Sequence, residues 1–97
     1  MKVKWTERAV SKYFATLDYW DDRNKSNTYS LQIIDAVNKE VKSIQQNPYF
    51  LAMYNQKLDM YRRIFFKGKF SLFYRVDVEN DTIWLMIFRS NKQKPID

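Results

Sequence analysis

The sequence has no cysteine and no histidine among its 97 residues, and it has one glycine. Without cysteine there is no disulfide, no thiolate nucleophile and no cysteine-bound metal. Without histidine the commonest general base and the commonest metal ligand are both missing. One glycine is too few for a glycine-rich phosphate-binding loop. Any chemistry must therefore rest on carboxylates, basic side chains and aromatic rings.

Long apolar runs are lacking as well. No stretch is long and apolar enough for a signal peptide or a membrane-spanning helix, so a cytoplasmic protein with no membrane partner is expected. The length predicts one domain, residues 1–97. The hydrophobic content of 45% and aromatic content of 18% argue against disorder, although 29% of the residues are charged.

The charges that are present are mostly positive. Seventeen Lys and Arg residues stand against eleven Asp and Glu residues, which gives a formal net charge of +6. A chain with this balance favours anionic partners, which are either nucleic acid or an acidic protein segment. Charge alone does not choose between them.

The C-terminal half predicts three consecutive strands, residues 60–66, 70–77 and 82–89. They are rich in aromatic and β-branched residues, and residues 67–69 and 79–81 between them supply turn chemistry. Gly68, the single glycine, is expected at a position of positive φ. The pattern therefore predicts an antiparallel meander of three strands.

Pairing about Asn80 divides the last two predicted strands into two faces. The predicted faces are Leu72, Tyr74, Val76, Ile83, Leu85 and Ile87 on one side, and Ser71, Phe73, Arg75, Trp84, Met86 and Phe88 on the other. Both faces are apolar, so the second must be covered by another part of the protein or bind a partner. Arg62 and Arg63 should lie on opposite faces, and the length of the turn at residues 67–69 decides which is where.

The N-terminal half predicts a short strand and a helical hairpin. Residues 2–5 alternate polar with apolar and read as a fourth strand. Thr6 offers an N-cap for a helix over residues 7–22, and Asn24 or Ser26 offers one for a second helix that ends near Gln46, because Pro48 restricts the residue before it. Residues 49–59 are predicted to be a packed loop. The fold class is α+β, with the strand and helical hairpin packed on an antiparallel sheet.

The carboxylates do not predict a metal site. Asp18, Asp21 and Asp22 lie at a helix end, and Asp77, Glu79 and Asp81 crowd a turn, but neither spacing matches a metal-binding loop. No metal and no cofactor is expected. The basic residues are more informative, because arginines within otherwise apolar strands are costly unless they are paired. Beside aromatic rings they can hold phosphates and stabilise an oxyanion.

A family resemblance rests on an ordered set of segments. These are residues 19–24 (YWDDRN), Asn47-Pro48, Arg62-Arg63, residues 70–76 (FSLFYRV) and residues 88–95 (FRSNKQKP). Together with the predicted order of strand, helical hairpin and meander, the set resembles the RelE/ParE superfamily of bacterial type II toxins over nearly the whole chain. The resemblance implies a growth-inhibiting toxin of a plasmid-stabilisation-like system, neutralised by a cognate antitoxin protein. Members of the family either cut messenger RNA in the ribosome or poison DNA gyrase.

Departures from the family pattern favour the ParE-like side. Ribonuclease members use a cluster of Lys and Arg with a C-terminal Tyr, or Glu, Arg and His. Here Ser71 stands where an arginine often does, the chain has no His, and no tyrosine follows Tyr74. Three hypotheses stay open: a toxin that inhibits gyrase or another essential target, a ribosome-dependent mRNA endoribonuclease, and a non-toxic interaction module that retains antitoxin binding. A homodimer and a toxin–antitoxin heterotetramer are both open as assemblies.

The resemblance and the strand pattern together nominate site residues. If the protein is a ribonuclease, the catalytic candidates are Arg62, Arg63, Arg89 and Lys92. The candidates for binding the target or the antitoxin are Phe73, Arg75, Trp84, Met86, Phe88 and Lys94.

Overall fold

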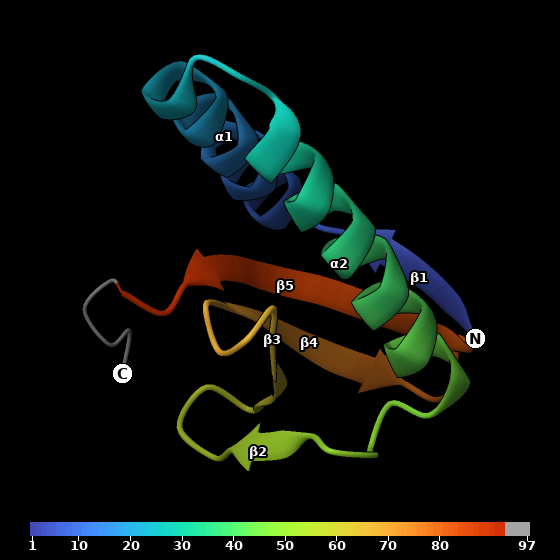
Figure 1. Ribbon diagram of the computed structural model, residues 1–97. Coiled ribbons are helices and arrows are strands. Elements are labelled where there is room, and N and C mark those ends of the chain that lie inside the picture. The colour runs from blue at the N-terminus through green and yellow to red at the C-terminus, as the bar shows by residue number, and fades with distance from the viewer. Residues whose placement is uncertain (93–97) are drawn as a thin grey trace.

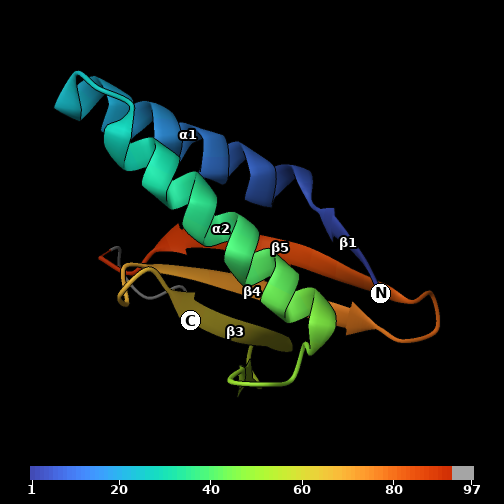
Figure 2. The ribbon, with the colours of Figure 1, turned by 45° about the vertical axis from the view of Figure 1, so that its right-hand side comes forward.

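A computed structural model of the protein describes residues 1–92, which form two helices and a five-stranded sheet. The elements in chain order are β1 (Lys2–Trp5), α1 (Glu7–Asn24), α2 (Thr28–Gln46), β2 (Met53–Asn55), β3 (Met60–Phe65), β4 (Phe70–Asp77) and β5 (Thr82–Ser90). Both helices lie on one face of the sheet (Figure 1, Figure 2). The predicted α+β class and the meander β3–β4–β5 are confirmed.

The sheet is mixed, with strand order β1-β5-β4-β3-β2. β1 adds a strand to the sheet, as predicted. It lies beside β5 and runs parallel to it, and Val3 pairs with Ile83. The prediction of a wholly antiparallel sheet was therefore wrong. Parallel neighbours need a crossover rather than a tight turn, and here the two helices and the rest of the sheet lie between the two strands. The alternation of polar and apolar residues predicted the strand, but it does not indicate whether the strand runs parallel or antiparallel to its neighbour.

β2 is a second correction. Residues 49–59 were predicted to be a loop, yet Met53–Asn55 pairs antiparallel with β3, Tyr54 opposite Tyr61. Three residues are too few to show a period-2 pattern. β2 forms because the chain turns back at residues 56–59 and meets an open edge of β3.

The helices begin and end close to the predicted positions. α1 starts after Thr6 and runs two residues beyond the predicted end, to Asn24, and Lys25 closes it in the left-handed conformation. α2 ends at Gln46, as predicted. The predicted cap of α2 was wrong, because its N-cap is Asn27 and the Asn27 side chain makes no capping hydrogen bond. The connection between the helices is short, so they form a hairpin whose apolar stripes face the sheet.

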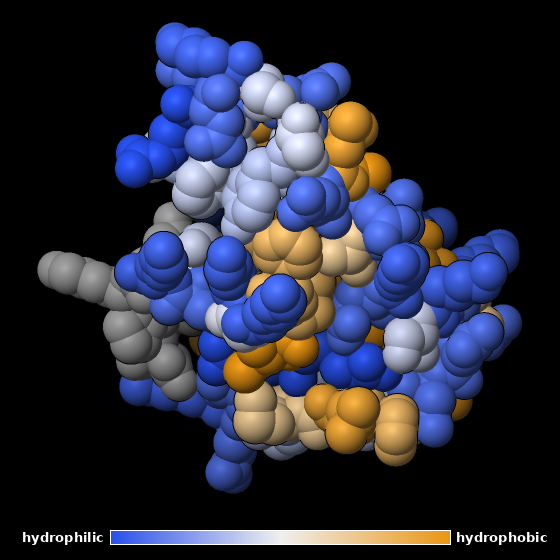
Figure 3. All heavy atoms as spheres, viewed as in Figure 1, coloured by the Kyte–Doolittle hydropathy of each residue, from blue (hydrophilic) through white to orange (hydrophobic). Residues whose placement is uncertain are grey.

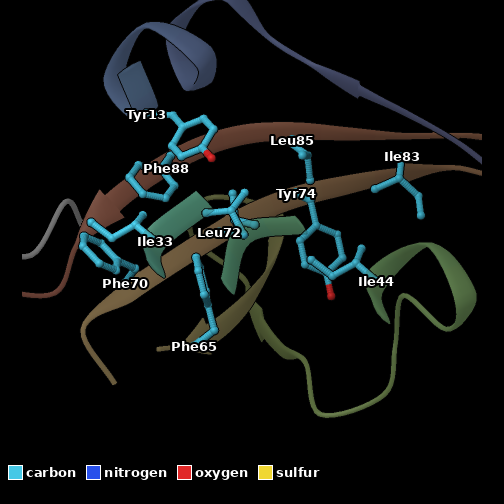
Figure 4. Close-up of a cluster of buried hydrophobic side chains, with 11 residues drawn as sticks. Tyr13, Ile33, Ile44, Phe65, Phe70, Leu72, Tyr74, Ile83, Leu85 and Phe88 are labelled. Carbon is cyan, nitrogen blue, oxygen red and sulfur yellow. The ribbon is translucent and has the colours of Figure 1, made fainter. Parts of the chain in front are cut away.

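The main core fills the space between the helices and the sheet (Figure 4). α1 contributes Tyr13 and α2 contributes Ile33, Val37 and Ile44. The sheet contributes Phe65, Phe70, Leu72, Tyr74, Ile83, Leu85 and Phe88. This burial holds the helical hairpin on one face and leaves the opposite face of the sheet without a helix.

Thr6 joins the start of α1 to β5. Its Oγ1 accepts a hydrogen bond from the Ala9 amide at 3.1 Å and donates to the Met86 carbonyl at 3.2 Å. Its amide donates to the Leu85 carbonyl at 3.0 Å. We expect Thr6→Ala to lower the free energy of unfolding by about 1–2 kcal/mol, because a cap and a long-range hydrogen bond are both lost. Urea denaturation tests this. Thr6→Ser keeps the hydroxyl and should retain most of the stability, and equal losses in the two variants would contradict the assignment.

A β-bulge between β4 and β5 reverses part of the predicted face assignment. Tyr74 pairs with Leu85, whereas Phe73 pairs with Ile87, so Met86 is an extra residue on β5. One extra residue shifts the alternation of every later side chain. Phe88 therefore pairs with Leu72 and lies in the main core, and Ile87 lies on the opposite face. The prediction that Phe88 shares a face with Phe73 and Trp84 was wrong, since nothing in the sequence marks the bulge.

Candidate functional site

The face of the sheet that the helices leave open carries a small second core. Met60, Phe73 and Ile87 form it, and Leu58 and Met86 pack against it. Arg75 holds the turn before β3 in place, because its Nε donates to the Asp59 carbonyl at 3.1 Å and its Nη2 donates to the Leu58 carbonyl at 3.2 Å. The predicted apolar face is thus covered in part by the protein's own chain.

A polar cluster of Arg62, Ser71 and Asn91 lies on the same face. Arg62 Nε donates to Ser71 Oγ and Arg62 Nη2 donates to Asn91 Oδ1, each at 3.0 Å. Ser71 Oγ in turn donates to Asn91 Oδ1 at 2.6 Å. Asn91 is itself fixed, because its Nδ2 donates to the Gly68 carbonyl at 2.8 Å and its amide to the Lys69 carbonyl at 2.9 Å. Arg62 is thereby held in one orientation.

The guanidinium of Arg62 keeps donors for a ligand. Its carbon lies 5.3 Å from the centroid of the Phe73 ring, a cation–π contact, and the side chain is half-buried. Within residues 1–92 its Nη1 makes no hydrogen bond, and no carboxylate bonds to Arg62. A preorganised cation with an open donor is suited to bind a phosphate or a carboxylate.

Arg89 lies beside this cluster. It pairs with Ser71 across the β4–β5 ladder, so its side chain belongs to the same face. It is 6% exposed, and its Nε donates to the Ser90 carbonyl at 3.4 Å. Arg62 is therefore the more accessible of the two cations.

Arg63, the neighbour of Arg62, lies on the helix face. Its Nη1 bonds to Glu40 Oε2 at 2.9 Å, and its Nη2 bonds to Ser43 Oγ at 3.1 Å and to the Asn47 carbonyl at 3.4 Å. The two charged side chains are 5% and 17% exposed. The prediction that the arginines lie on opposite faces is confirmed. Arg63 connects β3 to the end of α2 and is not part of the Arg62 cluster.

The remaining sequence-predicted candidates are scattered. Trp84 and Met86 are half-buried on the open face, and Lys4 Nζ lies 5.5 Å from the Trp84 ring centroid. Phe73 is buried in the second core and Phe88 in the main core. Lys92 is exposed on the side of α1, away from Arg62, and Lys94 lies outside the described residues.

Asn91 is the residue that sequence reasoning missed. It orients Arg62 and bonds to Ser71, which had been noted only as a departure from the family pattern. The available signal was its position two residues after Arg89, which places both side chains on one face of an extended chain. An asparagine beside a strand end ordinarily indicates a turn, so its bonding to Arg62 was not foreseen.

Tyr74 connects the sheet to the segment that follows α2 through a hydrogen bond. Its hydroxyl donates to the Pro48 carbonyl at 2.6 Å. Burial raises the pKa of Tyr74 above its ordinary value of 10.0, while the charge of Arg63 opposes the rise. The unfolded chain therefore loses this proton at a lower pH than the folded chain does. The contribution of Tyr74 to stability is complete below pH 10 and decreases as the pH rises above it.

We expect the free energy of unfolding to decrease more steeply above pH 10 in the wild-type chain than in Tyr74→Phe. Urea denaturation at a series of alkaline pH values measures both slopes. At neutral pH the variant should lose about 1 kcal/mol through the missing hydrogen bond. Parallel slopes for the two proteins would show that Tyr74 is not the group responsible.

Residues 1–92 show neither a metal site nor a membrane span. They contain no group of three or more carboxylates placed to hold a metal ion. Neither α1 nor α2 is apolar enough over its length to cross a membrane. Comparison of the chain with protein-family models, with curated proteins and with solved structures found no match. The site must therefore be interpreted from its own geometry.

Proposed function

We propose that this protein is a toxin of a type II toxin–antitoxin system, that a cognate antitoxin masks it, and that it acts in the cytoplasm by binding an essential target such as DNA gyrase. The proposal extends the RelE/ParE resemblance of the sequence. The element order of strand, helical hairpin and C-terminal meander is the order that the resemblance implies, and it supports the proposal.

The observation that carries the proposal is the Arg62 cluster. An arginine that two side chains orient, with a donor open to a ligand, is arranged for binding an anionic group of a macromolecular target. A cation without such a role would ordinarily be solvated or paired with a carboxylate. The cluster lies on the face of the sheet opposite the two helices (Figure 2).

The chemistry of the cluster favours binding over ribonuclease activity. The side chains of the cluster are a hydroxyl, an amide and a guanidinium, none of which is an ordinary general base, and the chain has no histidine. The cluster thus stabilises negative charge but offers no group to move a proton. Ribosome-dependent cleavage of messenger RNA is the second candidate, and the proximity of Arg62 and Arg89 favours it. In that case alanine at either position should cost about 3 kcal/mol or more in activity.

A masking partner is supported by the apolar surface around β2. Large apolar side chains that are more than half exposed gather there: Tyr49, Phe50, Leu51, Met53 and Tyr54. Leu51 is 74% exposed. Figure 3 shows apolar colours along the lower edge, where Figure 1 places β2. β2 is also an edge strand and can accept an extended peptide. We place the antitoxin contact here rather than on the face of Phe73, which the protein's own chain already covers in part.

Pulse-labelling of DNA and protein synthesis after induction of the chain without its antitoxin tests the proposal. We expect DNA synthesis to stop while translation continues. Prompt arrest of translation with cut messenger RNA would replace the gyrase-type target by the ribosome. Normal synthesis of both at high soluble expression would leave only the non-toxic interaction module.

A further inference from the structure

A groove of about 500 Å³ lies between α1 and the end of β5, on the opposite side of β5 from the Arg62 cluster. Three cations line it: Lys12 and Arg23 from α1 and Lys92 from the residues after β5. Two aromatic rings, Tyr19 and Trp20, line it as well, and none of the carboxylates in the described part of the chain does. In Figures 1 and 2 the second half of α1 extends away from the end of β5.

Among residues 1–92, no carboxylate compensates the positive charge of the groove. Lys12, Tyr19 and Arg23 follow one another at helical spacing and share one face of α1, whereas the four acidic residues of α1 line none of the groove. The ion pairs of residues 1–92 include none of the three cations. The groove therefore attracts anions from solution.

The rings make the groove more than a cationic surface. Tyr19 is 55% exposed, and its ring meets the Trp20 ring edge to face, with centroids 5.2 Å apart. Arg23 lies over Trp20 at 6.0 Å from the centroid, and its Nη1 donates to the Tyr19 hydroxyl at 3.4 Å. The Tyr19 ring is thereby positioned beside the charge. Flat aromatic surfaces next to cations are the combination by which proteins bind unpaired bases and their phosphates.

The spacing of the cations indicates a ligand with several linked phosphates rather than a single phosphate. Lys12 and Arg23 are eleven residues apart on α1, hence about 16 Å along the helix axis. This separation favours contacts to different phosphates of one strand over contacts to a single phosphate. An acidic peptide would satisfy the cations but would leave the Tyr19 ring without a stacking partner, and a base within a duplex could not reach the ring.

We propose that this groove binds single-stranded nucleic acid, with Lys12, Arg23 and Lys92 contacting phosphates and Tyr19 stacking on a base. Binding here does not require the protein to be toxic, and it uses none of the Arg62 cluster. Asn91 lies between two groove residues in sequence but bonds to Arg62 on the other side. The two sites can therefore be altered separately.

Fluorescence anisotropy of a short labelled oligothymidylate tests the proposal with the full chain. The triple variant Lys12→Ala/Arg23→Ala/Lys92→Ala should bind at least about tenfold more weakly, and the slope of log affinity against log salt should fall by about 2, since each phosphate contact contributes about 0.7. The matched control Lys2→Ala/Lys42→Ala/Lys57→Ala removes the same charge from exposed positions elsewhere and should retain most of the affinity.

Substitution of the ring tests the stacking contact. Tyr19→Ala should weaken binding by about fivefold or more, whereas Tyr19→Phe keeps the ring and should bind almost as the wild type does. Equal losses in the two triple variants, or no loss in Tyr19→Ala, would overturn the proposal. So would binding of a matching duplex or of polyglutamate as tight as that of the single strand, or full competition by a free mononucleotide at equal concentration.

Discussion

Arg63→Ala is expected to lower the free energy of unfolding by about 3–5 kcal/mol, because it leaves Glu40 poorly exposed and without its cation. It also removes the hydrogen bonds to Ser43 and to the Asn47 carbonyl, so the end of α2 loses its connection to β3. A loss of this size is a large part of the total stability of a domain of this length. Urea denaturation followed by circular dichroism measures it.

The matched control is the neighbouring residue. Arg62→Ala removes an equally charged side chain from the other face of the same strand and should cost less than about 1 kcal/mol, since the buried Ser71 and the half-buried Asn91 still bond to each other. The double variant Arg63→Met/Glu40→Leu should recover most of the loss, because it removes both buried charges and also the Arg63 Nε, which is buried without a partner among residues 1–92. Similar losses for Arg62→Ala and Arg63→Ala would contradict the division of roles.

Arg62→Ala is expected to reduce growth inhibition strongly, although it changes the free energy of unfolding little. Truncation of a central arginine contact commonly costs about 2 kcal/mol or more in binding. The variant should therefore need at least about tenfold higher expression than the wild type to arrest growth. Colony counts across a series of inducer concentrations, with the protein level followed in the same cultures, measure this shift.

Two further variants separate the geometry of Arg62 from its charge. Arg62→Lys keeps the charge but not the planar fork that Ser71 and Asn91 orient, so it should remain impaired. Lys42→Ala removes an exposed charge elsewhere and should inhibit growth as the wild type does. Full activity of Arg62→Ala at an unchanged protein level would show that the cluster is not the functional site.

The parts of the fold that could be predicted are those that depend on patterns of neighbouring residues. The apolar stripe of α2, the Thr6 cap of α1 and the turn at Gly68 are all visible in the sequence, and Gly68 has the expected positive φ of 80°. These features depend on residues close together in the chain. The meander and the helical hairpin follow from them.

The length of the β3–β4 turn could not be predicted from the local sequence pattern. The connection comprises residues 66–69, one more than the longest predicted turn, and Phe66 and Lys67 are left-handed together with Gly68. A bulky residue is rarely left-handed, but the Phe66 ring packs against Tyr29 and Phe70, and that packing compensates for the strain. This turn sets the register that places Arg62 opposite Phe73 and Arg63 opposite Leu72. Long-range packing thus decides which arginine belongs to the site.

The bulge at Met86 also depends on contacts between residues far apart in the chain. The carbonyls of Leu85 and Met86 accept hydrogen bonds from Thr6, so the distortion of β5 lies where the chain enters α1. No residue near Met86 indicates the bulge in the sequence. The sequence therefore indicated the type of site, basic and aromatic on a sheet, but the bulge and the turn determined which side chains meet there.

Viability after induction of the chain in the absence of any antitoxin tests the central proposal most directly. We predict that colony counts fall within a few generations and that co-expression of the cognate antitoxin restores them. Unimpaired growth of cells that contain a high level of soluble, folded wild-type protein would contradict the proposal that this chain is a toxin.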